Sequence, residues 1–195
     1  MSRSSSGTRA RILDCTCNLL ESGDKKVRMS DIAKASRISR QALYLHFPTR
    51  AELLVAATRH IDSVKNVDAR LAASRAATSG RERLVAFISA WGGYIPEIYG
   101  MSVALRAMRA SDAEAAAAWD DRMQAVRHGC AAAVKALAAD KTLRPDLDEE
   151  VATDLLWTLL SVENWEQLVR DCGWSQSDYE TQIERLAETA LLATD

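Results

Sequence analysis

A short stretch near the amino terminus, ISRQALYLHFPTR (residues 38–50), concentrates side chains that can bind an anionic, hydrogen-bonding surface. It carries Arg40, Gln41, Tyr44 and His46 within about two helical turns. In the major groove of DNA, arginine pairs with guanine and glutamine with adenine through two parallel hydrogen bonds. Polar side chains at the ends of such a helix fit phosphate oxygens. These residues therefore predict a helix that binds double-stranded DNA, and an ordinary solvated helix is the alternative.

Two short helices have to position these side chains. The apolar pattern predicts one helix over about residues 29–36 and another over about residues 40–47, joined by the turn SRIS. Ser39 can cap the second helix by accepting a hydrogen bond from a backbone amide of its first turn. Ile38 can fill the gap between the two helices. Together these features predict a helix-turn-helix.

Helical periodicity continues through the chain, and the sequence predicts an all-α protein of about nine helices. Only three prolines and eight glycines interrupt it, and no run alternates apolar and polar residues between turn signals. The other predicted helices are a first from about Thr8 to Glu21, ended by Gly23; a long fourth after Thr49 that includes Leu71; a fifth from Leu84 to Trp91, broken at Gly92, Gly93 and Pro96; a sixth to Met108; a seventh opened by SDAE at Ser111; an eighth from Asp146 to Cys172; and a ninth from Ser177 to Leu192.

The net charge of −2 hides an asymmetry between the two ends of the chain. Residues 1–60 hold eleven Lys and Arg against five Asp and Glu, and residues 61–195 hold fourteen against twenty-two. The first segment is therefore basic by six charges and the second acidic by eight. A basic segment on an acidic body is typical of a polyanion-binding module attached to a domain with another task.

Composition predicts a soluble protein in the cytoplasm, without a membrane partner. Hydrophobic residues make up 48% and charged residues 27%, and no apolar run approaches the roughly 20 residues of a membrane span. The amino terminus MSRSSSGTRA lacks the apolar segment of a secretory signal. The four cysteines, Cys15, Cys17, Cys130 and Cys172, are scattered, so we expect reduced thiols that fill core space.

Residues 9–57 resemble the DNA-binding domain of the tetracycline-repressor (TetR) family. The matching positions are Ile12, Leu13, Asp14, Ile32, Ala33, Ser39, Leu43, Tyr44, His46, Phe47, Arg50 and Leu53. The resemblance implies a homodimeric transcription factor, usually a repressor, whose larger carboxy-terminal domain binds a small molecule and releases a palindromic DNA operator. It implies a DNA-binding domain over residues 1–48 and a helical ligand-binding and dimerisation domain over residues 49–195.

Three positions depart from the family pattern. Arg37 replaces the usual turn glycine, and a non-glycine residue at positive φ costs roughly 1 kcal/mol. Arg28 stands where relatives carry Ser or Thr before the second helix, whereas capping rules alone favour Ser30, so both starts remain open. Ala42 stands where many relatives carry a hydroxyl that contacts DNA, so this chain either loses that contact or uses the Ala42 methyl group against a thymine. The predicted DNA-binding residues are Arg28, Arg37, Ser39, Arg40, Gln41, Ala42, Tyr44, His46 and Arg50.

The last two predicted helices favour a dimer. The segment EVATDLLWTLLSVENWEQLV is apolar nearly all round, so this helix has more apolar surface than one core can cover. A two-fold interface would bury the surplus and space two recognition helices about 34 Å apart. A monomer with these helices in its core is the alternative. The predicted interface residues are Leu156, Leu160, Tyr179, Ile183, Leu186 and Ala190.

Aromatic and methionine side chains gather on the predicted fifth to eighth helices and suggest a flat, apolar ligand pocket. Each of them alone is more often part of a core. The candidates for binding a small-molecule effector are Trp91, Tyr94, Tyr99, Met101, Met108, Trp119, Met123, His128, Trp157 and Trp165. The chemical identity of the effector does not follow from the sequence.

An enzyme is the competing class of protein, and the sequence argues against it. His46, His60 and His128 lie far apart, and no Glu-x-x-His or His-x-x-x-His pair places metal ligands on one helix face. No glycine-rich phosphate loop follows a strand. We therefore expect no cofactor and no catalysis. A DNA-binding dimer without an inducer, or a protein-interaction adaptor, remains the alternative to a ligand-responsive regulator.

Overall fold

The computed structural model describes residues 3–22 and 27–193. These residues form helices and one isolated antiparallel bridge between Leu143 and Leu192, which confirms the predicted all-α class. They divide into two compact units. The first unit holds the residues up to Asn66 together with Ile98–Met123, and the second holds Val67–Glu97 together with the residues from Gln124 onward.

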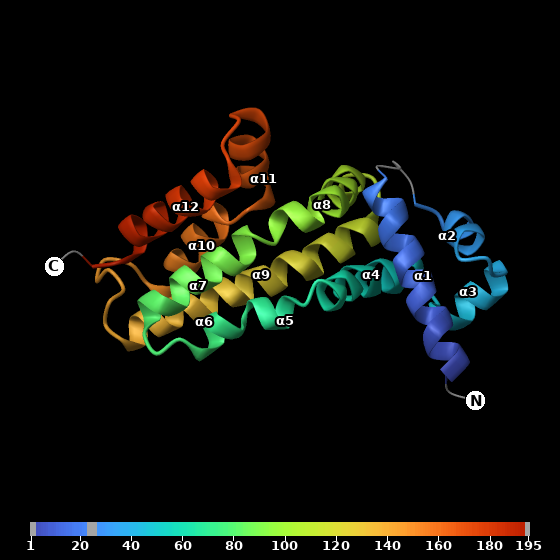
Figure 1. Cartoon of the computed structure of the whole chain (residues 1–195), viewed down its shortest axis with the longest axis horizontal. Helices are drawn as coiled ribbons and strands as arrows, with labels where there is room; N and C mark the ends of the chain where they lie inside the picture. The colour runs from blue at the N-terminus through green and yellow to red at the C-terminus, as the bar shows by residue number, and fades with distance from the viewer. Residues whose placement is uncertain (1–2, 23–26, 194–195) are drawn as a thin grey trace. The chain divides into compact units, whose positions relative to one another are not determined.

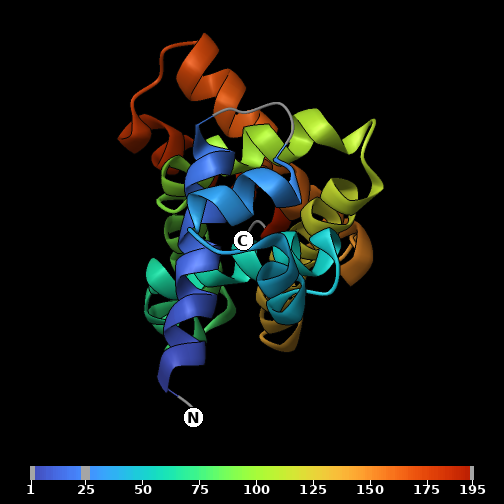
Figure 2. The same ribbon diagram turned by 90° about the vertical axis from the view of Figure 1, so that its right-hand side faces the viewer.

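In the first unit, α1 (Arg3–Glu21) packs against α4 (Arg50–Val64). Figure 2 shows α1 in dark blue on the side that faces the viewer. Ile12 and Leu20 of α1 and Leu53 of α4 are fully buried. Burial of one such side chain contributes roughly 1.5 to 3 kcal/mol to stability. The predicted end of the first helix at Gly23 lies outside the described residues.

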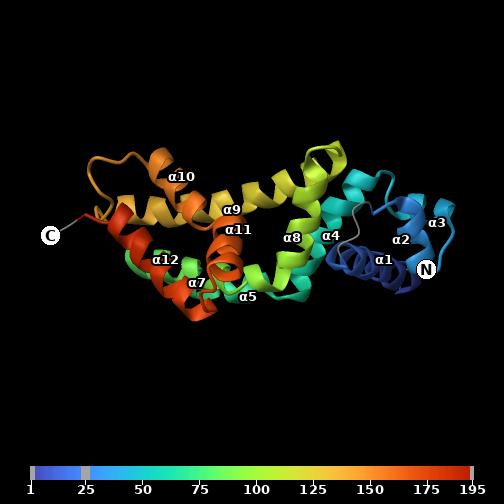
Figure 3. The same cartoon turned by 90° about the horizontal axis from the view of Figure 1, so that it is seen from above.

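The predicted helix-turn-helix is present in this unit. α2 (Met29–Ala35) packs against both α1 and α3 (Arg40–His46), as Figure 3 shows. Ser39 caps α3, because its Oγ accepts a hydrogen bond from the backbone amide of Ala42 at 3.1 Å. Leu43 and Phe47 are buried, so the opposite face of α3 is turned outward.

The fourth helix is shorter than the apolar pattern predicts. Instead of continuing through Leu71, α4 ends at Val64. Asn66 follows with a φ of 53°, a left-handed conformation that a right-handed helix does not contain. The chain resumes in the second unit as α5 (Val67–Arg70) and α6 (Ala72–Ala76). The predicted domain boundary after residue 48 stays a prediction, and α4 belongs to the first unit.

In the second unit, α7 (Gly80–Gly92) packs against α6 and against α12 (Gln176–Leu191). α10 (Glu149–Leu159) packs on α12 as well. The part of α9 (Ala113–Ala139) in this unit approaches α7 at Gly129. A Cβ atom added there would lie 2.4 Å from the Phe87 ring, so only glycine permits this approach. α8 (Ile95–Arg109), like α9, contributes residues to both units.

The predicted eighth helix is three elements in the structure. α10 is followed by α11 (Val162–Trp165) and a π-helix, η1 (Glu166–Asp171), and Figure 1 shows the chain turning out through them and returning into α12. Ser161 is extended at the break, and its Oγ accepts a hydrogen bond from the Asn164 amide at 3.1 Å. The Leu160 carbonyl accepts one from the Trp91 indole at 2.8 Å. A partner on another helix therefore satisfies the carbonyl that the break releases.

Three helices begin one or two residues away from their predicted starts. The observed caps are Asp112, Asp148 and Ser175, where the sequence pattern predicts Ser111, Asp146 and Ser177. Each region offers several Ser or Asp oxygens side by side, and all of them are able to cap. The direction in which the chain enters the helix decides among them, and that direction depends on tertiary contacts.

The described cysteines occupy different environments, and all four are free thiols. Burial raises the pKa of Cys17 and of Cys130 to about 12, so these thiols stay protonated in the core. Cys172 is exposed, so the prediction that it fills core space is wrong. None of the described helices combines the length and the apolar character that a bilayer span requires.

Trp91→Phe is expected to lower the free energy of unfolding by about 1 to 3 kcal/mol, because the Leu160 carbonyl loses its donor. Urea unfolding followed by circular dichroism measures this change. Trp157→Phe is the matched control, since the Trp157 ring is only half-buried. Equal losses in the two variants would show that the indole hydrogen bond does not matter.

Candidate DNA-binding interface

The outward face of α3 carries the side chains that the sequence singles out. Arg40, Gln41 and Tyr44 are all exposed. Leu45 lies four residues after Gln41 on the same face and is 82% exposed, the highest value among the exposed large apolar side chains of the described residues. Leu45 is not among the predicted DNA-binding residues, although its spacing from Gln41 indicates the same direction. This face therefore combines a cation, an amide, a phenol and an apolar group.

Arginines of α1 hold the carboxyl ends of both short helices. Arg9 donates to the His46 carbonyl at 2.8 Å, and its guanidinium lies 4.1 Å from the centre of the Phe47 ring. Arg11 donates to the Ser36 carbonyl at 3.1 Å. The last carbonyls of a helix have no partner within it, so these bonds fix where α2 and α3 end.

Arg28 is the N-cap residue of α2, which settles the choice between Arg28 and Ser30. A guanidinium cannot accept a hydrogen bond from the first turn. The cap works in the other direction instead: the Asp31 carboxylate accepts a hydrogen bond from the backbone amide of Arg28 at 3.3 Å. The Arg28 side chain is exposed and adds positive charge at the start of α2.

Arg37 stands in the turn with a φ of 53°, as the comparison with the family pattern predicts. The Ile38 amide bonds to the Ala33 carbonyl and the Arg37 amide to the Lys34 carbonyl, both at 3.1 Å. This pair of bonds is a Schellman motif, in which glycine is the usual left-handed residue. Arg37 is exposed, so the turn presents a charge where glycine would present none.

Three further predicted DNA-binding residues are half-buried or already form a hydrogen bond within the protein. Ser39 is exposed but its hydroxyl caps α3. Ala42 and His46 are half-buried. They lie at the border of the exposed face, so any DNA contact by them is at its edge.

Arg50 differs from the expectation of a free phosphate-binding side chain. Its Nε donates to the Val27 carbonyl at 2.6 Å, and its Nη1 donates to the carboxylates of Asp112 at 2.8 Å and Glu114 at 3.3 Å. The side chain is 13% exposed. Donors committed to these acceptors are not available to phosphate, so the geometry does not support the predicted contact.

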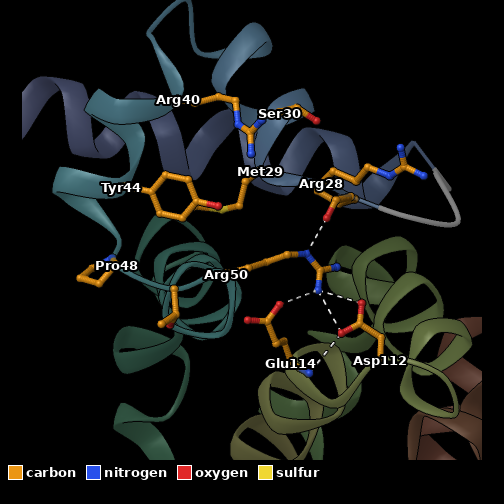
Figure 4. A pocket seen from close by; sticks show the side chains of 11 residues that line it. Arg28, Met29, Ser30, Arg40, Tyr44, Pro48, Arg50, Asp112 and Glu114 are labelled. Atoms are coloured by element: carbon orange, nitrogen blue, oxygen red, sulfur yellow. Dashed lines mark hydrogen bonds and ion pairs between the residues drawn. The ribbon is translucent and has the colours of Figure 1, made fainter.

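Arg50 lies on the floor of an open groove of about 530 Å³. Figure 4 shows the groove, with Arg40 and Tyr44 on one side and Asp112 and Glu114 on the other. All of the lining residues belong to the first unit. The groove brings the cations of α2 and α3 close to two carboxylates, and Arg50 stands between the two groups.

The predicted effector-binding residues do not form one cluster within either unit. Tyr99, Met101, Met108, Trp119 and Met123 belong to the first unit, and Trp91, Tyr94, His128, Trp157 and Trp165 to the second. Six of the ten are buried. His128 is exposed. The indoles of Trp91 and Trp165 donate to Leu160 and to Gln176, which indicates structural roles for these two side chains.

The predicted dimer residues are mostly core residues of the chain itself. Leu156, Leu160, Tyr179 and Ile183 are buried within the second unit and are not exposed to a partner. Leu186 is 48% exposed, and Ala190 is half-buried. The inner faces of α10 and α12 therefore belong to the core of the chain itself, and an interface on these helices stays a prediction. The outward apolar residues of α10 are Val151 and Leu155, which are 46% and 41% exposed.

Among the described residues, no group of three or more His, Cys, Asp or Glu side chains is arranged to hold a metal ion. His60 bonds instead to Asp14 at 2.7 Å.

Known proteins resemble this chain in two respects: the sequence of its helix-turn-helix region and the fold of the whole chain. Residues 12–57 match the model of bacterial regulatory proteins of the tetR family. That segment contains α2, α3 and about half of α1 and of α4. A search of curated protein sequences finds no match.

Solved structures share the fold at low sequence identity. A candidate TetR-family transcriptional regulator from Rhodococcus sp. has 21% identity and a TM-score of 0.74, with 94% of this chain and 98% of that chain covered. A candidate transcriptional regulator from Saccharomonospora viridis in complex with choline has 20% identity and a TM-score of 0.74, covering 97% and 100%. The regulator FadR from Bacillus subtilis in complex with stearoyl-CoA has 13% identity and a TM-score of 0.74, covering 92% and 97%.

The family model covers the helix-turn-helix, and the structural matches cover nearly the whole of this chain. Residues 12–57 therefore match the tetR family of bacterial regulatory proteins, and the whole chain shares the fold of the solved regulators.

Proposed function

We propose that this DNA-binding regulator is a repressor that releases a palindromic operator when a small, largely apolar or aromatic molecule binds its carboxy-terminal part. The observation that carries the DNA-binding half of the proposal is the outward face of α3. There Arg40 and Gln41 offer hydrogen-bond donors for base edges, and Leu45 offers an apolar surface for a thymine methyl group. Arg28 and Arg37 add exposed positive charge on neighbouring elements.

Two observations support a small-molecule effector. The similar structures from S. viridis and B. subtilis are complexes with choline and with stearoyl-CoA. In the second unit, the Tyr179 hydroxyl is buried and has no hydrogen-bond partner among the described residues. An unpaired buried hydroxyl costs about 1 to 3 kcal/mol, and a polar group of a ligand would remove that penalty.

A homodimer is supported by the outward face of α10 and α12. Val151 and Leu155 of α10 and Leu186 of α12 are exposed large apolar residues on two helices that pack together. Exposed apolar surface of this kind favours association with a second copy. A dimer would present two α3 helices to the two halves of an operator. A location in the cytoplasm and the lack of a catalytic role belong to the same proposal.

Selection of bound duplexes from random DNA, repeated with candidate small molecules, tests the proposed function. A regulator enriches one motif and loses it when its effector is present. Because coupling is reciprocal, the operator must weaken effector binding by the same factor. A motif that no molecule displaces would favour a DNA-binding dimer without an inducer. Failure to bind DNA in a salt-dependent manner would favour a protein-interaction adaptor.

Arg40→Ala is expected to weaken binding to the preferred site by about 1 to 3 kcal/mol and to relax the preference at one base pair. Leu45→Ala should relax a preference for thymine, since a methyl contact is lost. Parallel selection from random DNA measures both effects. Lys34→Ala, which removes an exposed cation of α2, serves as the control that leaves the motif unchanged. An unchanged motif with Arg40→Ala would refute its role in base recognition.

Leu155→Arg combined with Leu186→Arg is expected to give a folded monomer, because an interface would have to bury two unpaired charges. Operator affinity should fall with it, since one half-site binds weakly. Sedimentation and circular dichroism measure assembly and folding. Val64→Arg, at another exposed apolar residue, is the control that should remain dimeric. A wild-type chain that is monomeric at micromolar concentration would contradict the dimer.

Tyr179→Phe is expected to leave the free energy of unfolding unchanged or to raise it by about 1 kcal/mol, because the hydroxyl it removes has no partner among the described residues. Affinity for an effector that bonds to Tyr179 should fall about tenfold. Urea unfolding and calorimetric titration separate the two effects. A loss of stability without a loss of effector affinity would assign the hydroxyl a structural role.

A further inference from the structure

Arg50 connects the amino-terminal ends of three helices within the first unit (Figure 4). It is the first residue of α4, and its Nε reaches the Val27 carbonyl, which lies two residues before α2. Its Nη1 reaches Asp112, whose carboxylate also accepts the Glu114 and Ala115 amides at 3.1 Å and thereby caps α9. One side chain thus ties the starts of α2, α4 and α9 together.

Glu114 strengthens the same connection from the opposite side. Its Oε1 accepts a hydrogen bond from the backbone amide of Ala51 at 3.3 Å, in the first turn of α4. Its Oε2 bonds to Arg50 at 3.3 Å. The starts of α4 and α9 are therefore bonded to each other. The end of α3 is only three residues, Phe47 to Thr49, away from this cluster.

The cluster also has an electrostatic consequence for the exposed face of α3. Asp112 and Glu114 line the groove that Arg40 and Tyr44 also line, and their side chains are 26% and 43% exposed. Two unneutralised carboxylates there would repel the phosphates of a DNA duplex approaching α3. The guanidinium of Arg50 lies within 3.3 Å of both carboxylates and offsets this charge.

We infer that Arg50 is a positioning residue, which supports DNA binding through Asp112 and Glu114 and not by contact with phosphate. Through these two carboxylates it links the start of α4 to the start of α9 and screens their charge from the duplex. This inference rests on the proposed DNA-binding function. It predicts that the contribution of Arg50 to DNA affinity disappears when the two carboxylates are neutralised.

A double-mutant cycle with mixed-sequence duplex DNA tests the inference without requiring the operator. Arg50→Ala alone is expected to weaken DNA binding about tenfold, within the range of coupling energies measured between contacting residues. In a background of Asp112→Asn and Glu114→Gln, the same Arg50→Ala change should alter affinity by less than about twofold. An equal loss in both backgrounds would overturn the inference, because Arg50 would then act independently of the two carboxylates.

The salt dependence gives a second readout that a merely structural role would not produce. Loss of a phosphate contact reduces the slope of log affinity against log salt by about 0.9. In the carboxylate-neutral background, Arg50→Ala is expected to leave this slope unchanged. A reduced slope there would overturn the inference. A wild-type chain without any salt-dependent affinity for DNA would instead refute the proposed function.

Two variants control for folding and for charge. Arg59→Ala removes another α4 arginine, paired with Asp121 at 2.7 Å, and should change DNA affinity by less than about twofold. Arg50→Lys keeps one charge beside the carboxylates and should recover most of the affinity that Arg50→Ala loses. If Arg50→Ala does not fold, as judged by circular dichroism, Arg50→Gln, which keeps a polar side chain but removes the charge, provides the cycle in the two backgrounds. A loss of equal size for Arg50→Gln in both backgrounds would then overturn the inference.

Discussion

The unsatisfied backbone groups at helix ends are the constraint on which this structure depends. A short helix such as α2 or α3 has more unpaired terminal backbone groups than internal hydrogen bonds. Its ends therefore need partners, and many of those partners come from other helices. Arg9 and Arg11 of α1 supply donors for the carboxyl ends of α3 and α2. Glu114 supplies an acceptor for the start of α4. The orientation of α3 is thus set by charged side chains distant in sequence.

Because of the same bonds, fewer basic side chains of the amino-terminal segment are available to an anionic partner than their number indicates. A count of lysines and arginines treats every cation as available to an anionic partner. In the structure, Arg9, Arg11 and Arg50 donate to backbone carbonyls, and Arg59 pairs with Asp121. The exposed cations of α2, α3 and their turn are a smaller set, Arg28, Lys34, Arg37 and Arg40. Charge near DNA is therefore divided between cations that build the domain and cations that remain on its surface.

The sequence predicts the local features of this fold well, because they depend on neighbouring residues. The approximate extents of α2 and α3 and the Ser39 cap follow from spacing within a few positions, and the left-handed Arg37 follows from the resemblance to the family pattern. Features that depend on distant contacts were missed. The break after Leu160 requires the Trp91 indole, and the inward face of Tyr179 requires the helices that cover it. The engagement of Arg50 requires Asp112, sixty-two positions later in the chain. Apolar periodicity identifies a helix face, but it does not say whether its own chain or a second copy covers that face.

The left-handed conformation of Arg37 limits which amino acids can replace it in the turn. Backbone geometry at position 37 favours glycine, and to a lesser degree asparagine or aspartate. Position 37 is exposed beside α3, where a positive side chain attracts an anionic partner. No natural amino acid meets both demands, since glycine lacks the charge and lysine shares the steric penalty of arginine. A substitution at this position can therefore relieve the backbone strain of the turn or keep its positive charge, but not both.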